Sequence, residues 1–163
     1  MKDVLVNAVK GGMKAEMDAV TLYEEAANKS NDQEVKKFFL DRANEEKSHY
    51  NFLLSFYEAL DGMGDMADIK IHDNSVSPAI SENFITRISQ NQFLFSAIST
   101  AILLEKNGID YYRKCAQETK SVQALSDFFH VLVDWEMRHY DELMKIQKDA
   151  EEIYWRFNKF EPF

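Results

Sequence analysis

The sequence is poor in the residues that interrupt regular structure. Only five glycines and two prolines occur among its 163 residues. A β-sandwich or barrel needs many tight turns, so this scarcity favours long helices. The chain also contains a single cysteine, Cys115. One cysteine excludes an intrachain disulfide framework and a four-cysteine zinc or iron–sulfur site within one chain.

Basic residues are outnumbered by acidic ones. The chain has 19 Lys and Arg against 28 Asp and Glu, for a formal net charge of −9. This balance argues against nucleic acid or an anionic membrane surface as the main partner, and it is compatible with binding cations. No apolar run reaches 18 residues, and the N-terminal MKDVLVNAVKGG lacks the apolar stretch of a signal peptide. We therefore expect one globular domain in the cytoplasm, without nucleic-acid or membrane partners.

Four segments carry apolar residues at helical spacing. Between the second and third of them lies DGMGDMADIKIHDNSVSP, which holds two of the glycines, one of the prolines and many small polar residues. We interpret residues 62–80 as a connection. The predicted helices cover, approximately, residues 3–29, 32–60, 81–119 and 121–157.

A polar pattern recurs in the two halves of the chain. Glu16 is followed seven residues later by Tyr23, and Glu105 is followed seven residues later by Tyr112. The two glutamates are 89 positions apart. Little else in the two halves is alike, so the polar residues keep a spacing that the packing residues do not.

A second shared pattern lies about 30 residues after the first. Glu46 and His49 form Glu-x-x-His, and so do Glu136 and His139. Both members of the second pair lie 90 positions after their counterparts. Residues three apart project from the same face of a helix. In both cases that face also carries the apolar residues, which predicts that these charged groups are buried.

The spacing brings the glutamates of each predicted hairpin to one level. The first turn falls near residue 31, so Glu16 and Glu46 are each about 15 residues from it, or roughly 22 Å along a helix. The second turn falls near residue 120, and Glu105 and Glu136 lie about as far from it on either side. Four carboxylates in one core layer would repel one another and lose their hydration. Two divalent cations would neutralise them, and two imidazoles would complete an oxygen-rich ligand set suited to Fe, Mn or Zn.

This ligand pattern resembles that of the ferritin-like di-iron carboxylate superfamily, most closely its rubrerythrin branch. The resemblance covers nearly the whole chain and implies an all-α, ferritin-like four-helix bundle. It implies that Glu46 and Glu136 bridge two iron ions and that Glu16 and Glu105 are terminal ligands. The implied metal ligands are Glu16, Glu46, His49, Glu105, Glu136 and His139.

The resemblance also assigns supporting roles to neighbours of these ligands. It implies that Tyr23 and Tyr112 each donate a hydrogen bond to the terminal glutamate of the opposite half. Glu45 fits an acidic residue that orients His139. Trp135 occupies the matching place in the second half, where no such carboxylate stands.

Departures from the family pattern shape the functional expectation. The cysteine-rich rubredoxin-like domain of full-length rubrerythrins is absent from this sequence, so a peroxidase would need an external electron donor. Gly108 stands where rubrerythrins carry an additional glutamate. Lys47 stands where bacterioferritins carry a haem-binding methionine, so we expect no haem.

Three functions remain open at this stage. The first is a di-iron oxidoreductase that reacts with O2 or H2O2 as a peroxidase, an oxidase or a ferroxidase. The second is a non-catalytic iron-handling or metal-binding module, with Mn or Zn as other possible occupants. The third is a metal-free interaction bundle.

Several structural expectations complete the interpretation. A pseudo-two-fold axis relating the two halves makes the second and third helices parallel, so the 62–80 connection must cross the length of the bundle. About 20 extended residues reach roughly 65 Å, which is enough. We expect His72 and His130 at the surface or in packing roles, and Cys115 buried. The aromatic residues of the C-terminus suggest a core or homodimer contact: Tyr154, Trp155, Phe157, Phe160 and Phe163.

Overall fold

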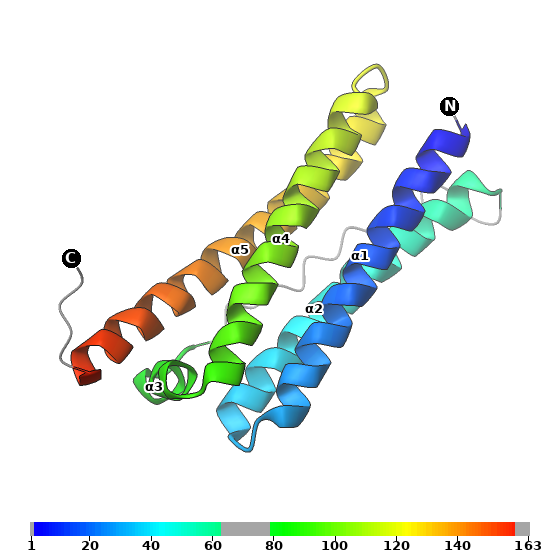
Figure 1. The fold of residues 1–163 in the computed structure, drawn as a ribbon. Helices are drawn as coiled ribbons and strands as arrows, with labels where there is room; N and C mark the ends of the chain where they lie inside the picture. The colour runs from blue at the N-terminus through cyan, green and yellow to red at the C-terminus, as the bar shows by residue number, and fades with distance from the viewer. Residues whose placement is uncertain (1, 63–78, 159–163) are drawn as a thin grey trace.

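The computed structural model describes residues 2–62 and 79–158. Within these ranges the chain forms five α-helices and no strand (Figure 1), which confirms the all-α prediction. The helices are α1 (Lys2–Lys29), α2 (Gln33–Leu60), α3 (Glu82–Gln90), α4 (Gln92–Glu118) and α5 (Gln123–Asn158).

Two long antiparallel hairpins make up the bundle. α1 packs mainly on α2, and α4 packs mainly on α5, while α1 and α4 join the two hairpins. In Figure 1, α2 and α4 run in the same direction, as the pseudo-two-fold arrangement requires. The predicted 62–80 connection, including His72, lies largely outside the described residues.

The turn of the first hairpin is fixed by a capping residue, Asp32. The side chain of Asp32 accepts hydrogen bonds from the backbone N–H groups of Glu34 and Val35. Such a cap satisfies donors that have no partner inside the helix. At the other end of α2, Gly62 has a φ of 79°, a conformation that glycine adopts without strain.

The prediction of one continuous helix over residues 81–119 is wrong. Asn91 has extended dihedral angles, φ −119° and ψ 103°, and it separates α3 from α4. Its side chain accepts a hydrogen bond from the backbone N–H of Leu94 and thereby caps α4. An asparagine that bonds to nearby backbone competes with helix continuation, and this local bond prevails here. The short α3 packs on α5 and α4.

The apolar core is divided into two clusters by a polar layer. One cluster contains Phe39, Ile98 and Leu143, and the other contains Leu53 and Phe129. Each long helix contributes residues to both clusters. Along every one of these helices, the predicted ligands lie between the two contributions, so the polar layer is buried at mid-height.

Other expectations can be compared with the same structure. Cys115 is buried and His130 is exposed, as predicted. Tyr154, Trp155 and Phe157 are 40–65% exposed, so they are not part of the core of a single chain, and Phe160 and Phe163 lie outside the described residues. None of the helices in the described ranges is long and apolar enough to cross a membrane.

Candidate metal centre

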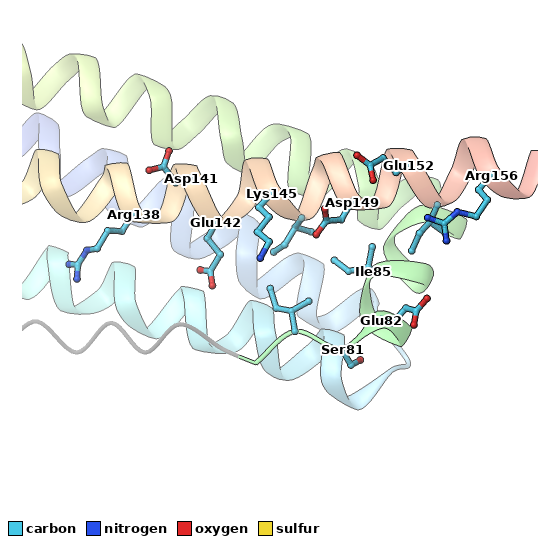
Figure 2. Close-up of a pocket in the computed structure, with 13 residues that line it drawn as sticks. Ser81, Glu82, Ile85, Arg138, Asp141, Glu142, Lys145, Asp149, Glu152 and Arg156 are labelled. Carbon is cyan, nitrogen blue, oxygen red and sulfur yellow. The ribbon is translucent and has the colours of Figure 1, made fainter. Parts of the chain in front are cut away.

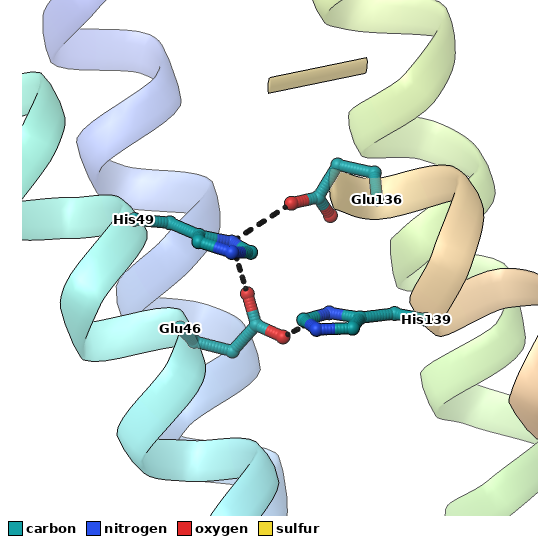
Figure 3. A group of neighbouring side chains, drawn as sticks. All are labelled: Glu46, His49, Glu136 and His139. Atoms are coloured by element: carbon teal, nitrogen blue, oxygen red, sulfur yellow. Dashed lines mark ion pairs between the residues drawn. The ribbon is translucent and has the colours of Figure 1, made fainter. Parts of the chain in front are cut away.

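Two Glu-x-x-His pairs meet at the centre of the bundle. Ligand atoms of Glu46, His49, Glu136 and His139 all lie within 4.8 Å of one another (Figure 3). Nδ1 of His49 is 3.1 Å from Oε2 of Glu46 and 3.1 Å from Oε1 of Glu136. Nδ1 of His139 is 2.9 Å from the other oxygen of Glu46, Oε1. Glu46 therefore lies between the two imidazoles, as a bridging ligand would.

The two remaining predicted ligands approach from α1 and α4. Oε2 of Glu16 is 3.5 Å from Nδ1 of His49, and Oε2 of Glu105 is 3.7 Å from Nδ1 of His139. All six predicted ligands are at most 6% exposed. The structure thus gathers the whole set, although binding of a metal by these residues stays a prediction.

The inward atoms of this cluster lack hydrogen bonds. Within the described part of the chain, six buried side-chain atoms at the centre, from five residues, have no hydrogen-bond partner. Nearly every other buried polar side-chain atom in these ranges has one. These atoms face one another at ion-pair distances, but a buried polar atom without a hydrogen bond costs about 1–3 kcal/mol, so a concentration of them needs a physical reason. Metal coordination supplies one, and the nitrogen and carboxylate donors fit Fe, Mn or Zn. The atoms are Glu46 Oε1 and Oε2, His49 Nδ1, Glu105 Oε2, Glu136 Oε1 and His139 Nδ1.

Without metal, the charges of the cluster balance one another through shifted pKa values. Burial alone would raise the pKa of Glu46, but the positive charges of His139 and His49 hold it well below its usual range. Burial would lower the pKa of each histidine, but the charge of Glu46 and the close approach of other carboxylates raise both pKa values well above 6.5. Protons on the imidazoles thus take the place that cations would fill.

Two of the other carboxyl groups are held towards their neutral forms. Burial raises the pKa of Glu16 to about 7, against the lowering effect of His49. Burial and the charges of Glu16, Glu105 and Glu46 raise the pKa of Glu136 well above 4.5. Four carboxylates cannot all ionise in this layer unless positive charge is added.

Two buried tyrosines tie the hairpins together at the centre. The hydroxyl of Tyr23 donates a hydrogen bond to Oε1 of Glu105, and that of Tyr112 donates one to Oε1 of Glu16. These are the partners that the sequence analysis expected. Burial and the nearby carboxylates raise both tyrosine pKa values well above 10, so the phenols remain protonated donors.

One supporting interaction was expected and another was missed. Nε2 of His139 lies 2.8 Å from Oε2 of Glu45, in the position predicted for this carboxylate. Sequence reasoning missed Arg42, which is 2% exposed and contacts both Glu45 and Glu142. Its position three residues before Glu45 was a signal, because this spacing places the two side chains on one helix face.

A cleft between α1 and α4 leads from the surface to the cluster. Its volume is about 210 Å³. The exposed residues Ala15 and Asn107 line it near solvent, and the buried Glu16 and Glu105 line its inner part. Gly108 adds no side chain, and a Cβ there would lie 3.0 Å from Oε2 of Glu136. Small molecules therefore have a route to the carboxylates.

Comparisons with known proteins agree with this geometry. A protein of Pyrococcus furiosus described as a ferritin-like-encapsulin shell fusion protein is 38% identical over 60 residues, which is 37% of this chain and 17% of that protein. The chain therefore matches only a minor part of the length of that relative. No solved structure matches. The family model described as Rubrerythrin matches residues 2–84, the segment that contains α1, α2 and the centre's first three ligands. On this match, supported by the buried Glu and His cluster, the chain belongs to the rubrerythrin family.

Proposed function

We propose that this protein binds two iron ions at the centre of the bundle and oxidises them with O2 or H2O2. The observation that carries the proposal is the set of buried, inward-facing nitrogen and oxygen atoms that lack hydrogen bonds. Glu46 and Glu136 are the proposed bridging residues. Glu16 with His49, and Glu105 with His139, are the proposed terminal ligands of the two positions.

When bound, two Fe(II) ions would supply the two electrons that, together with two protons, reduce one H2O2 to two waters. The chain supplies the environment for that reaction. Its two apolar clusters exclude bulk water from both sides of the polar layer. The cleft beside Gly108 is the proposed route of the oxidant. Tyr23 and Tyr112 hold the terminal glutamates in place.

Repeated turnover requires an outside source of electrons. Cys115 is the single cysteine of the sequence, so the chain cannot build a four-cysteine iron site of its own. We propose an external donor for a peroxidase activity, whereas ferroxidase activity would use Fe(II) itself as the reductant. A cytoplasmic location, which would provide such donors, stays part of this proposal.

The test is an anaerobic Fe(II) titration of the metal-free protein followed by mixing with O2 or H2O2. Binding of two ions per chain and rapid growth of ferric absorbance in the near ultraviolet are expected. Glu46→Gln should abolish both signals. Glu25→Gln, which removes an exposed carboxylate of α1, is the matched control and should change neither.

The same experiment separates the alternatives. Binding of two metal ions without oxidation would favour a metal-binding module and contradict the redox proposal. Absence of metal binding would favour a metal-free bundle. Comparison of the rates with O2 and H2O2 distinguishes oxidase or ferroxidase chemistry from peroxidase chemistry.

We also propose that the protein forms a homodimer. The exposed Tyr154, Trp155 and Phe157 place aromatic surface at the end of α5, where a second copy can cover it. Sedimentation of the wild type should show a dimer, and Phe157→Asp should shift it towards monomer. A monomeric wild type would refute this proposal.

A further inference from the structure

Three charged side chains form a chain of contacts behind His139, on the side away from the centre. Nε2 of His139 lies 2.8 Å from Oε2 of Glu45. The guanidinium of Arg42 meets both oxygens of Glu45, with Nη1 at 3.0 Å and Nη2 at 3.1 Å. Nη1 of Arg42 also lies 3.0 Å from Oε2 of Glu142. The orientation of the His139 ring is therefore fixed by a carboxylate that is itself held by a buried arginine.

The outer end of this chain of contacts reaches the surface. Glu142 is on the wall of a groove of about 770 Å³ between α3 and α5 (Figure 2). Its side chain is 18% exposed, compared with 2% for Arg42. A buried guanidinium is stable only when it is paired, and here two carboxylates from different hairpins share it. The arrangement depends on both hairpins and is a specific feature of the fold.

The internal repeat shows that the other half lacks this arrangement. Glu46 and His49 match Glu136 and His139 at an offset of 90. The same offset, applied to the three charged residues, leads to three buried apolar side chains, which are 5%, 0% and 7% exposed. Glu45 corresponds to Trp135, Arg42 to Leu132, and Glu142 to Phe52.

On the side away from the centre, His49 is consequently held by packing. The rings of His49 and Trp135 are stacked, with centroids 4.7 Å apart and an interplanar angle of 14°. The ring of Phe52 meets Trp135 edge-on, at 5.1 Å and 63°. In residues 2–62 and 79–158, no carboxylate stands behind His49 as Glu45 stands behind His139. Stacking restrains the plane of a ring, but it does not determine which ring nitrogen carries the proton.

A carboxylate on the outer nitrogen changes how an imidazole binds metal. By accepting a hydrogen bond from Nε2–H, Glu45 fixes the proton of His139 on Nε2, so that Nδ1 is the nitrogen that faces the centre and can bind metal. Such a partner also increases the basicity of the ligating nitrogen, and its loss typically lowers metal affinity 10–100-fold. Nδ1 of His49 also faces Glu46, at 3.1 Å, but His49 lacks such a partner on its outer nitrogen within the described residues.

We propose that the two metal positions are inequivalent. The position at His139 and Glu105 binds metal first and more tightly, and the position at His49 and Glu16 binds second and releases metal first. The difference arises from the Glu45–Arg42–Glu142 contacts on one side and the Trp135–Phe52 contacts on the other. The inference rests on the metal-binding part of the proposed function and is independent of the redox part.

The test is anaerobic calorimetry of the metal-free, full-length protein with Fe(II), repeated with Co(II), whose visible spectrum reports its ligands. The wild type should bind two ions in separate steps that differ at least 10-fold in affinity. Glu45→Gln should lower the affinity of the His139 position about 10–100-fold and leave the affinity of the His49 position unchanged, so the two steps should converge or exchange order. It should also alter the Co(II) spectrum of the first equivalent.

Matched variants separate positioning from general damage to the fold. Trp135→Phe keeps an aromatic ring against His49. It should leave unchanged both the affinity of the first binding step and the Co(II) spectrum of the first equivalent. Glu142→Gln weakens the Glu45–Arg42–Glu142 contacts from their exposed end. It should lower the metal affinity of the His139 position less than Glu45→Gln does. Glu45→Asp, which retains the carboxylate, should recover part of the lost affinity.

The outcomes distinguish this proposal from the proposed function. Two steps of equal affinity in the wild type would overturn inequivalence while leaving metal binding intact. Equal losses in both steps for Glu45→Gln would overturn it as well. Absence of metal binding would overturn both proposals, whereas two unequal steps without iron oxidation would overturn only the redox function.

Discussion

The hydroxyl of Tyr23 lies 2.5 Å from Oε1 of Glu105, a residue 82 positions later in the chain and in the other hairpin. Tyr112 and Glu16 make the reciprocal contact in the opposite direction. Each tyrosine satisfies one oxygen of a buried carboxyl group and leaves the other facing the centre. The two hairpins are therefore joined by polar contacts at the level where apolar packing is interrupted.

Tyr23→Phe should destabilise the metal-free protein. The variant keeps the ring but leaves Oε1 of Glu105 without its donor, and an unsatisfied buried acceptor costs about 1–3 kcal/mol. Urea unfolding at fixed pH measures the loss. Tyr140→Phe is the matched control, because the Tyr140 hydroxyl makes no hydrogen bond within the described chain. Equal stability of Tyr23→Phe and the wild type would show that this bond contributes nothing net.

Glu46→Gln and Glu136→Gln should have different effects without metal and the same effect with it. Glu46 is the carboxylate that pairs with both cationic histidines, and breaking a buried pair costs about 3–5 kcal/mol. Burial and the neighbouring carboxylates shift the pKa of Glu136 upwards, towards its neutral form, so an amide should replace Glu136 at a smaller cost than Glu46. Both variants should lose metal-dependent stabilisation. Thermal unfolding of both variants, with and without Fe(II), measures these effects. Equal losses of stability in the two metal-free variants would contradict the different charge states assigned to Glu46 and Glu136.

The metal-free protein should become less stable as the pH rises through neutrality. The raised pKa of Glu16, about 7, means that the folded state keeps a proton that the unfolded chain releases above 4.5. Likewise, His49 and His139 hold protons that the unfolded chain releases above 6.5, so their contribution is complete below 6.5 and is lost as the pH passes their folded pKa values. Each unit of pKa shift corresponds to about 1.4 kcal/mol.

Metal should reverse this trend. Because cations replace the protons on the ligands, binding releases protons and tightens as the pH rises. Urea unfolding at pH 6 and pH 8, with and without Zn(II), compares the two dependences. The stabilisation by metal should be larger at pH 8, and a smaller stabilisation there would contradict proton displacement.

Gly108→Ala should weaken metal binding without destabilising the fold. Its Cβ would lie 3.0 Å from Oε2 of Glu136 and would displace that carboxylate. In the metal-free protein the end of the glutamate can move aside, and alanine favours the helix by about 1 kcal/mol. We expect unchanged or higher melting temperature and metal affinity reduced on the order of 10-fold, as for loss of a supporting contact. Asn107→Ala, at the neighbouring exposed position, should leave the affinity unchanged.

The polar centre could be located from the sequence because its residues are few and regularly spaced. Burial of a charged residue is costly, so Glu and His on apolar helix faces point to a shared purpose. The repeat then places Glu46 and Glu136 at one level. This reasoning does not depend on the packing details, which differ between the halves.

The helix break at Asn91 and the role of Arg42 were not predicted, for different reasons. Apolar periodicity continues across Asn91 with no glycine or proline, so the only signal was an asparagine able to cap α4. The spacing of Arg42 and Glu45 on one helix face indicates that these two residues pair. The other partner of Arg42, Glu142, belongs to a different hairpin. A pairing across 100 positions depends on how the hairpins dock, which local patterns do not encode.

The presence of both halves in one chain has a consequence for what substitution can achieve. In a symmetric pair of identical hairpins, any replacement at the position of Glu45 would appear twice, and both sides of the site would change together. Here one copy of that position carries Glu45 and the other carries Trp135. If the chain binds two ions as proposed, it can hold them differently, one retained and one exchanged. The loading of both is then independent of protein concentration.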